Sequence, residues 1–219
     1  MTDAVSAPSQ ARIRYHHGDL RQALLAAGIE LAREGGPDAV VLREATRRVG
    51  VSPNAAYRHF ADRDALLDAV CDAGQAELAI AIEQEFARVP EGDPASVARG
   101  HLRAIGTAYV QYARREPGLF RTAFSVPVDL SSSGRATAAG PNGLTPFQLL
   151  TWSLDEFVAA GIMPPERRPQ AEFLAWSSVH GFSMLLLDGP LRALPPEAAD
   201  AVTRRLVDMV EAGFTAPSA

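Results

Sequence analysis

Apolar residues recur along most of the chain with the spacing of α-helices. Between Gly18 and Arg33, one helical face carries Leu20, Ala23, Leu24, Ala27 and Leu31. Further long segments of this kind begin near Asp62, Asp93, Thr145, Gln170 and Pro195. Proline and glycine separate the segments, and no segment alternates with period two over the length of a strand. The pattern therefore predicts an all-α protein of about nine helices.

The stretch from Val41 to Phe60 has a different pattern, that of two short helices. The first fits Leu42 to Val49 and ends at Gly50, which can adopt the positive φ of a tight turn. Ser52 is a favourable N-cap for the second helix, which we expect to extend to about His59. Two short helices joined by a tight turn are the arrangement of a helix-turn-helix.

The second short helix would carry the residues that read DNA, because this helix enters the major groove. Asn54 and Ala55 are the candidates for base contact, since Asn can bond adenine bidentately and the Ala methyl can meet a thymine methyl. Other candidate contacts to bases or phosphates are Arg43, Arg47, Ser52, Pro53, Tyr57, Arg58 and His59. For Arg47 and Arg48 a solvent-exposed role without DNA contact is equally consistent with the sequence.

A net positive charge is found only in the N-terminal part of the chain, at residues 12–63. The 219-residue chain has a net charge of −5, yet residues 12–63 carry nine Arg against six acidic residues. Residues 64–219 carry twelve Arg against nineteen acidic residues, a net charge of −7. A basic region attached to an acidic one is expected of a protein that touches DNA at one end only.

The segment Gly50-Val-Ser-Pro-Asn-Ala-Ala-Tyr-Arg-His-Phe60, followed by Arg63 and Leu66-Leu67, resembles the signature of the TetR family. The stretch from Tyr15 to Arg21 resembles the start of the first helix in that family. The family usually has Lys at the position of Arg63, and Arg keeps the charge, so the resemblance adds Arg63 to the candidate phosphate contacts. It implies a TetR-like fold, with an N-terminal three-helix helix-turn-helix domain and a larger helical domain.

The rest of the chain resembles one type of TetR C-terminal domain, characterised by Trp, His and Gly, at Trp176, His180 and Gly181. This weaker resemblance implies a core that binds a small-molecule effector and dimerises through its last two helices. The candidate effector-binding residues are Tyr109, Tyr112, Phe120, Phe124, Trp152, Trp176, His180 and Met184. Periodicity does not separate residues that line a cavity from residues that pack in a core, so both roles stay open for each.

The expected domain organisation has three parts. Residues 1–11 are expected to be disordered, residues 12–62 to form the DNA-binding domain, and residues 63–219 to form the effector-binding and dimerisation domain. Within the last part, residues 126–143 are rich in Ser, Gly, Ala and Pro, which is typical of a mobile loop.

These features predict a cytoplasmic, ligand-responsive transcriptional regulator. We expect a repressor that binds palindromic operator DNA as a homodimer and is released by a small-molecule effector. Repression rather than activation rests on the family's usual behaviour, so an activator of the same fold is the alternative. A module that binds protein instead of DNA agrees less well with the basic charge of residues 12–63.

Other classes of function lack their sequence signatures. The chain has no G-x-S-x-G, phosphate-loop, G-x-G-x-x-G or HExxH motif, so we expect neither an enzyme nor a cofactor. The adjacent His16 and His17 have no partner at metal-ligand spacing, and the single Cys71 excludes an intrachain disulfide. The longest uncharged apolar stretch near the C-terminus, Phe173 to Leu187, is shorter than the ~20 residues of a membrane span.

Overall fold

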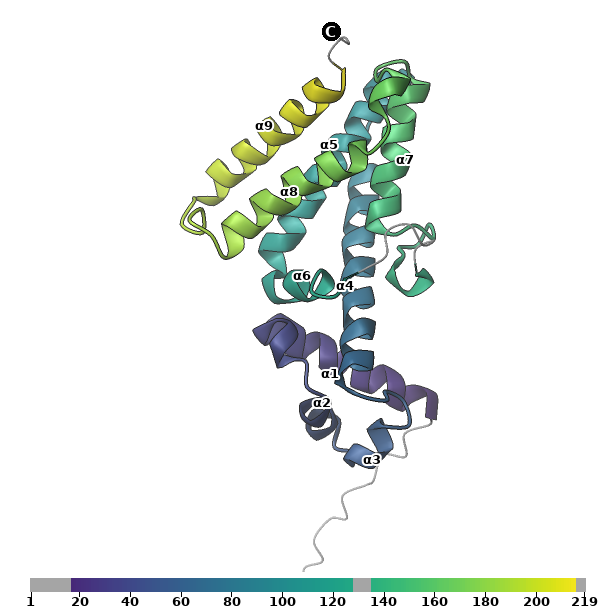
Figure 1. Cartoon of the computed structure of the whole chain (residues 1–219), viewed down its shortest axis with the longest axis vertical. Coiled ribbons are helices and arrows are strands. Elements are labelled where there is room, and N and C mark those ends of the chain that lie inside the picture. The colour runs from purple at the N-terminus through teal and green to yellow at the C-terminus, as the bar shows by residue number, and fades with distance from the viewer. Residues whose placement is uncertain (1–16, 128–134, 216–219) are drawn as a thin grey trace, which may run out of the picture.

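The computed structural model describes residues 17–127 and 135–215. Over these residues the chain forms nine α-helices, three short 3-10 helices and no strand, which confirms the all-α prediction. Three helices form a head at one end of the elongated molecule: α1 (His17–Gly35), α2 (Leu42–Val49) and α3 (Pro53–Ala56). The remaining helices form a larger body at the other end (Figure 1). None of the described helices is both long enough and apolar enough to cross a bilayer.

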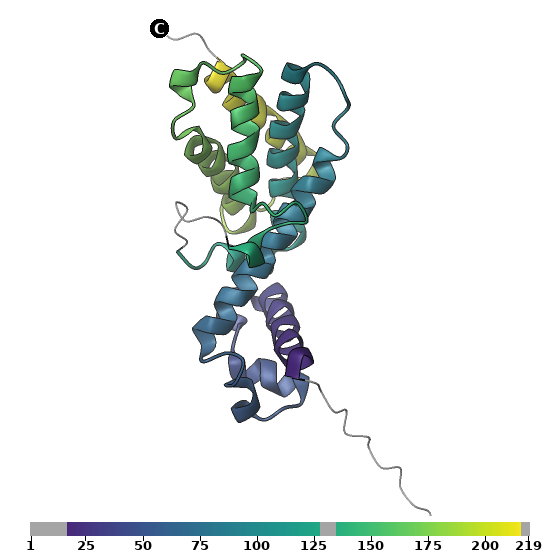
Figure 2. The same ribbon diagram turned by 90° about the vertical axis from the view of Figure 1, so that its right-hand side faces the viewer.

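Helix α4 (Arg63–Phe86) is the continuous element that joins the head to the body (Figures 1 and 2). It begins where Asp62 caps it, the carboxylate accepting a hydrogen bond of 2.8 Å from the Ala65 amide. Its first turns bury Leu66 and Val70 in the core of the head, and its later turns bury Leu78 and Ile82 in the core of the body. Two hydrophobic cores therefore share one helix.

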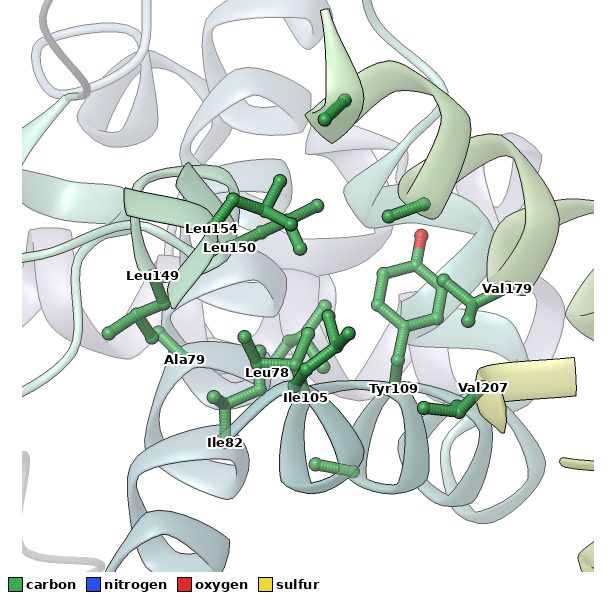
Figure 3. Packing of buried hydrophobic residues seen from close by; sticks show 14 of the residues in the cluster. Leu78, Ala79, Ile82, Ile105, Tyr109, Leu149, Leu150, Leu154, Val179 and Val207 are labelled. Atoms are coloured by element: carbon green, nitrogen blue, oxygen red, sulfur yellow. The ribbon is translucent and has the colours of Figure 1, made fainter. Parts of the chain in front are cut away.

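The body consists of five further helices packed around α4. They are α5 (Pro94–Arg115), α6 (Pro117–Ala123), α7 (Pro146–Ala159), α8 (Ala171–Leu187) and α9 (Pro196–Thr215). Their apolar faces meet in one core, where Ile105, Leu154 and Val207 come from three different helices (Figure 3). The capping box predicted at the start of α7 is present, because Thr145 and Gln148 bond each other's backbone amides.

Two local predictions were wrong. The second short helix ends at Ala56 rather than at His59, and residues 57–59 form a turn. The second concerns the mobile loop predicted at residues 126–143. Its residues 135–143 pack against α4, and its residues 128–134 lie outside the described residues. The 3-10 helix η2 (Ala136–Ala138) lies against α4. The hydroxyl of Thr137 donates a hydrogen bond of 2.5 Å to the carboxylate of Asp72 on α4, and Arg135 forms an ion pair of 3.0 Å with the same carboxylate. Long-range contacts of this kind leave no signal in local composition.

Helix α6 makes a second connection between head and body. Gly118 lies so close to the end of α1 that a Cβ atom there would be 2.2 Å from the carbonyl oxygen of Ala32. The next residue, Leu119, is buried in the head core, whereas Phe120 is buried in the body core. Arg33 of α1 adds ion pairs with Glu77 of α4 at 2.8 Å and with Glu116, just before α6, at 3.0 Å.

The substitution Gly118→Ala tests this contact. The added methyl group meets backbone carbonyl oxygens, which cannot swing aside as a flexible side chain can, so α6 must move away from α1. We expect the free energy of unfolding to fall by roughly 1–3 kcal/mol, measured by urea denaturation. Gly92→Ala is the matched control, because the nearest atom to its new Cβ is 3.9 Å away. Equal stability of the two variants would contradict the close approach.

Candidate functional site

The turn between α2 and α3 has the geometry that the sequence predicts. Gly50 adopts the left-handed conformation, with φ 75° and ψ 31°, and the amide of Val51 bonds the carbonyl of Thr46 at 3.1 Å. Ala45 and Ala56 are fully buried in the head core, so the small side chains let α2 and α3 pack closely. Phe60 lies in the same core, and the guanidinium of Arg21 stacks over its ring at 4.8 Å.

Most of the candidate DNA-contacting residues lie on the surface of α2, α3 and the turns beside them, at the end of the molecule away from the body (Figure 1). Tyr57 is the most prominent, with 56% of its surface exposed. Ala55 and His59 are half-buried. The exposed members of the set are Arg43, Arg47, Ser52, Pro53, Asn54, Tyr57 and Arg58. Ser52 occupies the N-cap position as predicted, but its side chain makes no capping hydrogen bond.

The arginines of the head differ in whether a carboxylate of the protein already pairs with them. Arg47 forms two hydrogen bonds with Glu44, at 2.6 Å and 2.9 Å, and Arg48 pairs with Glu34 at 2.5 Å. The hydrogen bond from Arg47 is the main reason that the pKa of Glu44 falls to about 2, so this carboxylate stays charged and offsets the arginine. Arg43 and Arg58 have no such partner among the described residues.

Arg63 has a structural role that sequence reasoning missed. Its guanidinium donates to the carbonyl oxygens of Val40 at 3.0 Å and Pro37 at 2.8 Å. These bonds fasten the 3-10 helix η1 (Pro37–Ala39), which follows α1, to the start of α4. A phosphate contact by Arg63 stays a prediction, but the structure already uses its donors inside the head.

The body contains a partly open cavity of about 470 Å³ between α4 and the helices that follow it. Its size falls in the range of roughly 300–1,000 Å³ that is usual for ligand pockets. Side chains from α5, α7, α8 and α9 meet there, and Figure 3 shows Ile105, Tyr109, Leu150, Val179 and Val207 among them. The rest of its lining comes from α4 and from the segment at the end of α6.

Four of the eight candidate effector-binding residues line this cavity: Tyr109, Phe124, Trp176 and His180. The other four do not line it. Tyr112 is fully buried and donates its hydroxyl proton to the carbonyl of Gly74 at 3.0 Å, and Phe120 is equally buried in the core. Trp152 lies on the outside of α7 with 40% of its surface exposed. Met184 packs against the core beyond the lining.

Several lining residues escaped the sequence analysis. Phe147 and Val210 belong to apolar helix faces, and periodicity does not tell which part of such a face borders a space. Gln75 did leave a signal, because it is a polar residue one turn from Cys71 and Leu78 on the buried face of α4. Its amide donates to the carbonyl of Ala123 at 3.0 Å and thereby joins α4 to the end of α6.

Three of the lining side chains form a hydrogen-bonded chain. The indole N–H of Trp176 donates to the hydroxyl oxygen of Tyr109 at 3.0 Å, and that hydroxyl lies 2.8 Å from Nδ1 of His180. The Tyr109 hydroxyl has no other acceptor among the described residues, so it donates its proton to Nδ1. His180 therefore carries its own proton on Nε2. Burial lowers the pKa of His180 and raises that of Tyr109, which keeps both groups neutral.

Two family models match the chain. The family model described as bacterial regulatory proteins, tetR family, matches residues 24–70, and the model of the Tetracyclin repressor-like C-terminal domain matches residues 102–210. The chain belongs to the TetR family of transcriptional regulators. Whether its body is of the type characterised by Trp, His and Gly stays a prediction.

Solved structures show the same fold. A protein of unknown function from Rhodococcus sp. RHA1 is 27% identical with a TM-score of 0.73, over 94% of this chain and all of that one. A tetR-family regulatory protein from Rhodococcus RHA1 is 18% identical with a TM-score of 0.56, over 91% of this chain and 98% of that one. A TetR variant from Acinetobacter baumannii AYE in complex with minocycline is 22% identical with a TM-score of 0.56, over 87% of this chain and 93% of that one. The search of curated proteins found no match.

The tautomer of His180 can be measured directly. At pH 7.5, above the ordinary histidine pKa of about 6.5, nitrogen-15 chemical shifts of the imidazole should show a neutral ring protonated on Nε2. The pKa of His180 is lower in the folded protein than in the unfolded chain. Below about pH 6.5 the unfolded chain therefore binds more protons at this residue than the folded protein does. The contribution of His180 to the free energy of unfolding is complete above that pH and is lost as the pH falls further. Tyr109→Phe should remove the tautomer preference. A ring protonated on Nδ1 in the native protein would contradict the assignment.

Proposed function

We propose that this protein is a ligand-responsive repressor that binds palindromic operator DNA as a homodimer and releases it when a small molecule fills the cavity. The observation that carries the proposal is that helix α4 belongs both to the head, which exposes the surface of α3, and to the body, which contains the cavity. Family membership supports a regulator without enzymatic activity, which would act in the cytoplasm where operator DNA is accessible. An activator of the same fold is the second candidate.

The DNA contacts follow from exposure and free donors on the head. Asn54 and Ala55 on α3 are assigned to base edges, and Tyr57 is assigned to the DNA backbone beside them. Arg43 and Arg58 are exposed and without a carboxylate partner among the described residues, so they supply the positive charge that attracts phosphates. Arg47 contributes less, because Glu44 offsets its charge.

We keep the division between DNA-binding and effector-binding functions at residues 62 and 63 as part of this proposal. It falls at the N-cap of α4, although Leu66 and Val70 beyond it still pack in the head core. The head therefore depends on the first turns of α4 for its own stability. A movement of α4 would carry the head with it.

A second copy of the chain is the proposed occupant of the exposed apolar face on α8 and α9. Of the large apolar side chains that the structure leaves exposed, those on these two helices are Phe173, Leu174, Leu185, Val202 and Met209. Leu174 and Met209 have 63% and 62% of their surface exposed, which is costly for a monomer in water. The two helices lie side by side on one side of the body (Figure 1). Pairing them would place two heads on successive major grooves, about 34–36 Å apart.

The contacts of α6 offer a route from the cavity to the head. Ala123 and Phe124 at the end of this helix line the cavity, whereas Gly118 and Leu119 near its start contact the head. A ligand that displaces the end of α6 would therefore press on α1 and change the separation of the two heads. The ligand needs only to bind the arrangement that does not fit DNA more tightly than the one that does.

Substitutions in α3 test the DNA contacts. Tyr57→Ala should weaken binding to all sequences, since it removes a contact to the DNA backbone, whereas Asn54→Ala should relax the preference at one base position per half-site. We expect losses on the order of 1–3 kcal/mol for the preferred base, measured by footprinting and selection from a random DNA library. Asn142→Ala, on the body, is the matched control and should bind like the native protein. Unchanged sequence preference in Asn54→Ala would refute its assignment.

A charge placed on the α8–α9 face tests the dimer. Leu174→Glu and Met209→Glu should each shift the protein from dimer to monomer in sedimentation velocity, because two carboxylates would be buried at the interface. Both should also lose DNA affinity, since single heads bind weakly. Ile80→Glu, at a partly exposed apolar residue of α4, should remain dimeric. A native protein that sediments as a monomer at micromolar concentration would overturn the dimer proposal.

A further inference from the structure

The lining of the cavity contains no charged side chain among the described residues. Apart from apolar and aromatic groups, it presents only five polar side chains, those of Gln75, Tyr109, Ser125, Ser177 and His180. His180 is neutral for the reasons given above. An ionised ligand would lose part of its hydration in this space without gaining a counter-charge, which is unfavourable.

The hydroxyl groups that line the cavity already donate hydrogen bonds to acceptors within the protein. Ser125 donates to the carbonyl of Thr122 at 2.9 Å, and Ser177 donates to the carbonyl of Leu174 at 3.1 Å. Tyr109 donates to His180, as described above. None of these hydroxyls can donate to a ligand without breaking a bond inside the protein.

The donor that remains at the centre of the aromatic wall is the Nε2–H of His180. Nδ1 accepts from Tyr109, and Nε2 has no partner among the described residues. The rings of Phe124 and Trp176 lie 5.2 Å and 5.8 Å from the imidazole, centroid to centroid, so the imidazole stands among aromatic rings. The side-chain amide of Gln75 on α4 has two N–H groups, and one of them remains beside the one that donates to the carbonyl of Ala123.

We propose that the effector is a neutral, mainly apolar ring compound with a carbonyl oxygen that accepts the Nε2–H hydrogen bond of His180. This inference rests on the proposed function, because it names the class of ligand for the same cavity. Phe124, Phe147 and Trp176 provide flat apolar surfaces for the rings. The carbonyl acceptor satisfies a donor that an apolar ligand would bury without a partner. Tyr109 and Trp176 are positioning residues, since they hold the tautomer of His180 that donates.

Three probe compounds of nearly the same shape separate the effect of the carbonyl acceptor on affinity from the effect of a negative charge. Benzophenone has the acceptor, diphenylmethane lacks it, and 4-benzoylbenzoate adds a negative charge. With the native protein, titration calorimetry should show benzophenone binding roughly tenfold more tightly than diphenylmethane, the effect of about one buried hydrogen bond. The benzoate should bind at least tenfold more weakly than benzophenone. Binding of benzophenone should shift the nitrogen-15 resonance of His180 Nε2.

Variants of His180 assign the preference to one atom. His180→Phe should bind benzophenone and diphenylmethane equally, and its retained affinity for diphenylmethane shows that the cavity is intact. His180→Gln, which restores an N–H donor, should recover part of the preference for the ketone. His101→Phe is the matched control, because His101 bonds Glu156 away from the cavity lining, and it should keep the full preference.

Three results would overturn the proposal: benzoate binding as tightly as benzophenone, a ketone preference that survives in His180→Phe, or no binding of benzophenone to a folded native protein. Operator binding without ligand, measured separately, tests the proposed function independently. If the native protein binds its operator and the benzoate releases it, the regulator stands and the ligand class is wrong. If no DNA is bound but the ketone preference follows His180, the ligand class stands and the proposed function fails.

Discussion

The close packing of α6 against α1 is the constraint on which the relation between head and cavity depends. Gly118 leaves no room for a side chain between the two backbones, and Leu119 and Phe120 then enter different cores. Together with α4, which also belongs to both cores, this contact holds the head to the body at two places. In the proposed mechanism, a change at the cavity would be transmitted as a movement of packed helices, because close-packed interiors shift as units rather than deform gradually.

The cavity combines an apolar lining with a small number of oriented polar groups. The chain from Trp176 through Tyr109 to His180 fixes the direction of each proton, so the environment that a ligand meets is set before it binds. Burial reinforces this order, because it disfavours the charged forms of both Tyr109 and His180. The head has the opposite character. Its surface is exposed and charged, and several of its arginines are already balanced by neighbouring carboxylates.

How far the sequence could predict these features depended on the range of the interactions involved. Helix limits set by proline, glycine and capping residues were recognisable, as at Gly50 and at the capping box of Thr145. Features set by partners distant in the chain were not. Arg63 bonds carbonyl groups more than twenty residues away, and η2 is held by Asp72 on α4. The eight candidate effector-binding residues are alike in type, and only helix packing separates the four that line the cavity.

The sequence by itself determined the helical class, the positions of the helices and the helix-turn-helix, because these follow from periodicity, turn residues and caps within a few residues of one another. It also determined the separation of charge between the two ends of the chain. The tertiary structure alone decided that a cavity exists, which aromatic residues border it and which nitrogen of His180 carries the proton. These properties arise where α4 to α9 meet, and no local pattern in one helix records what packs against it.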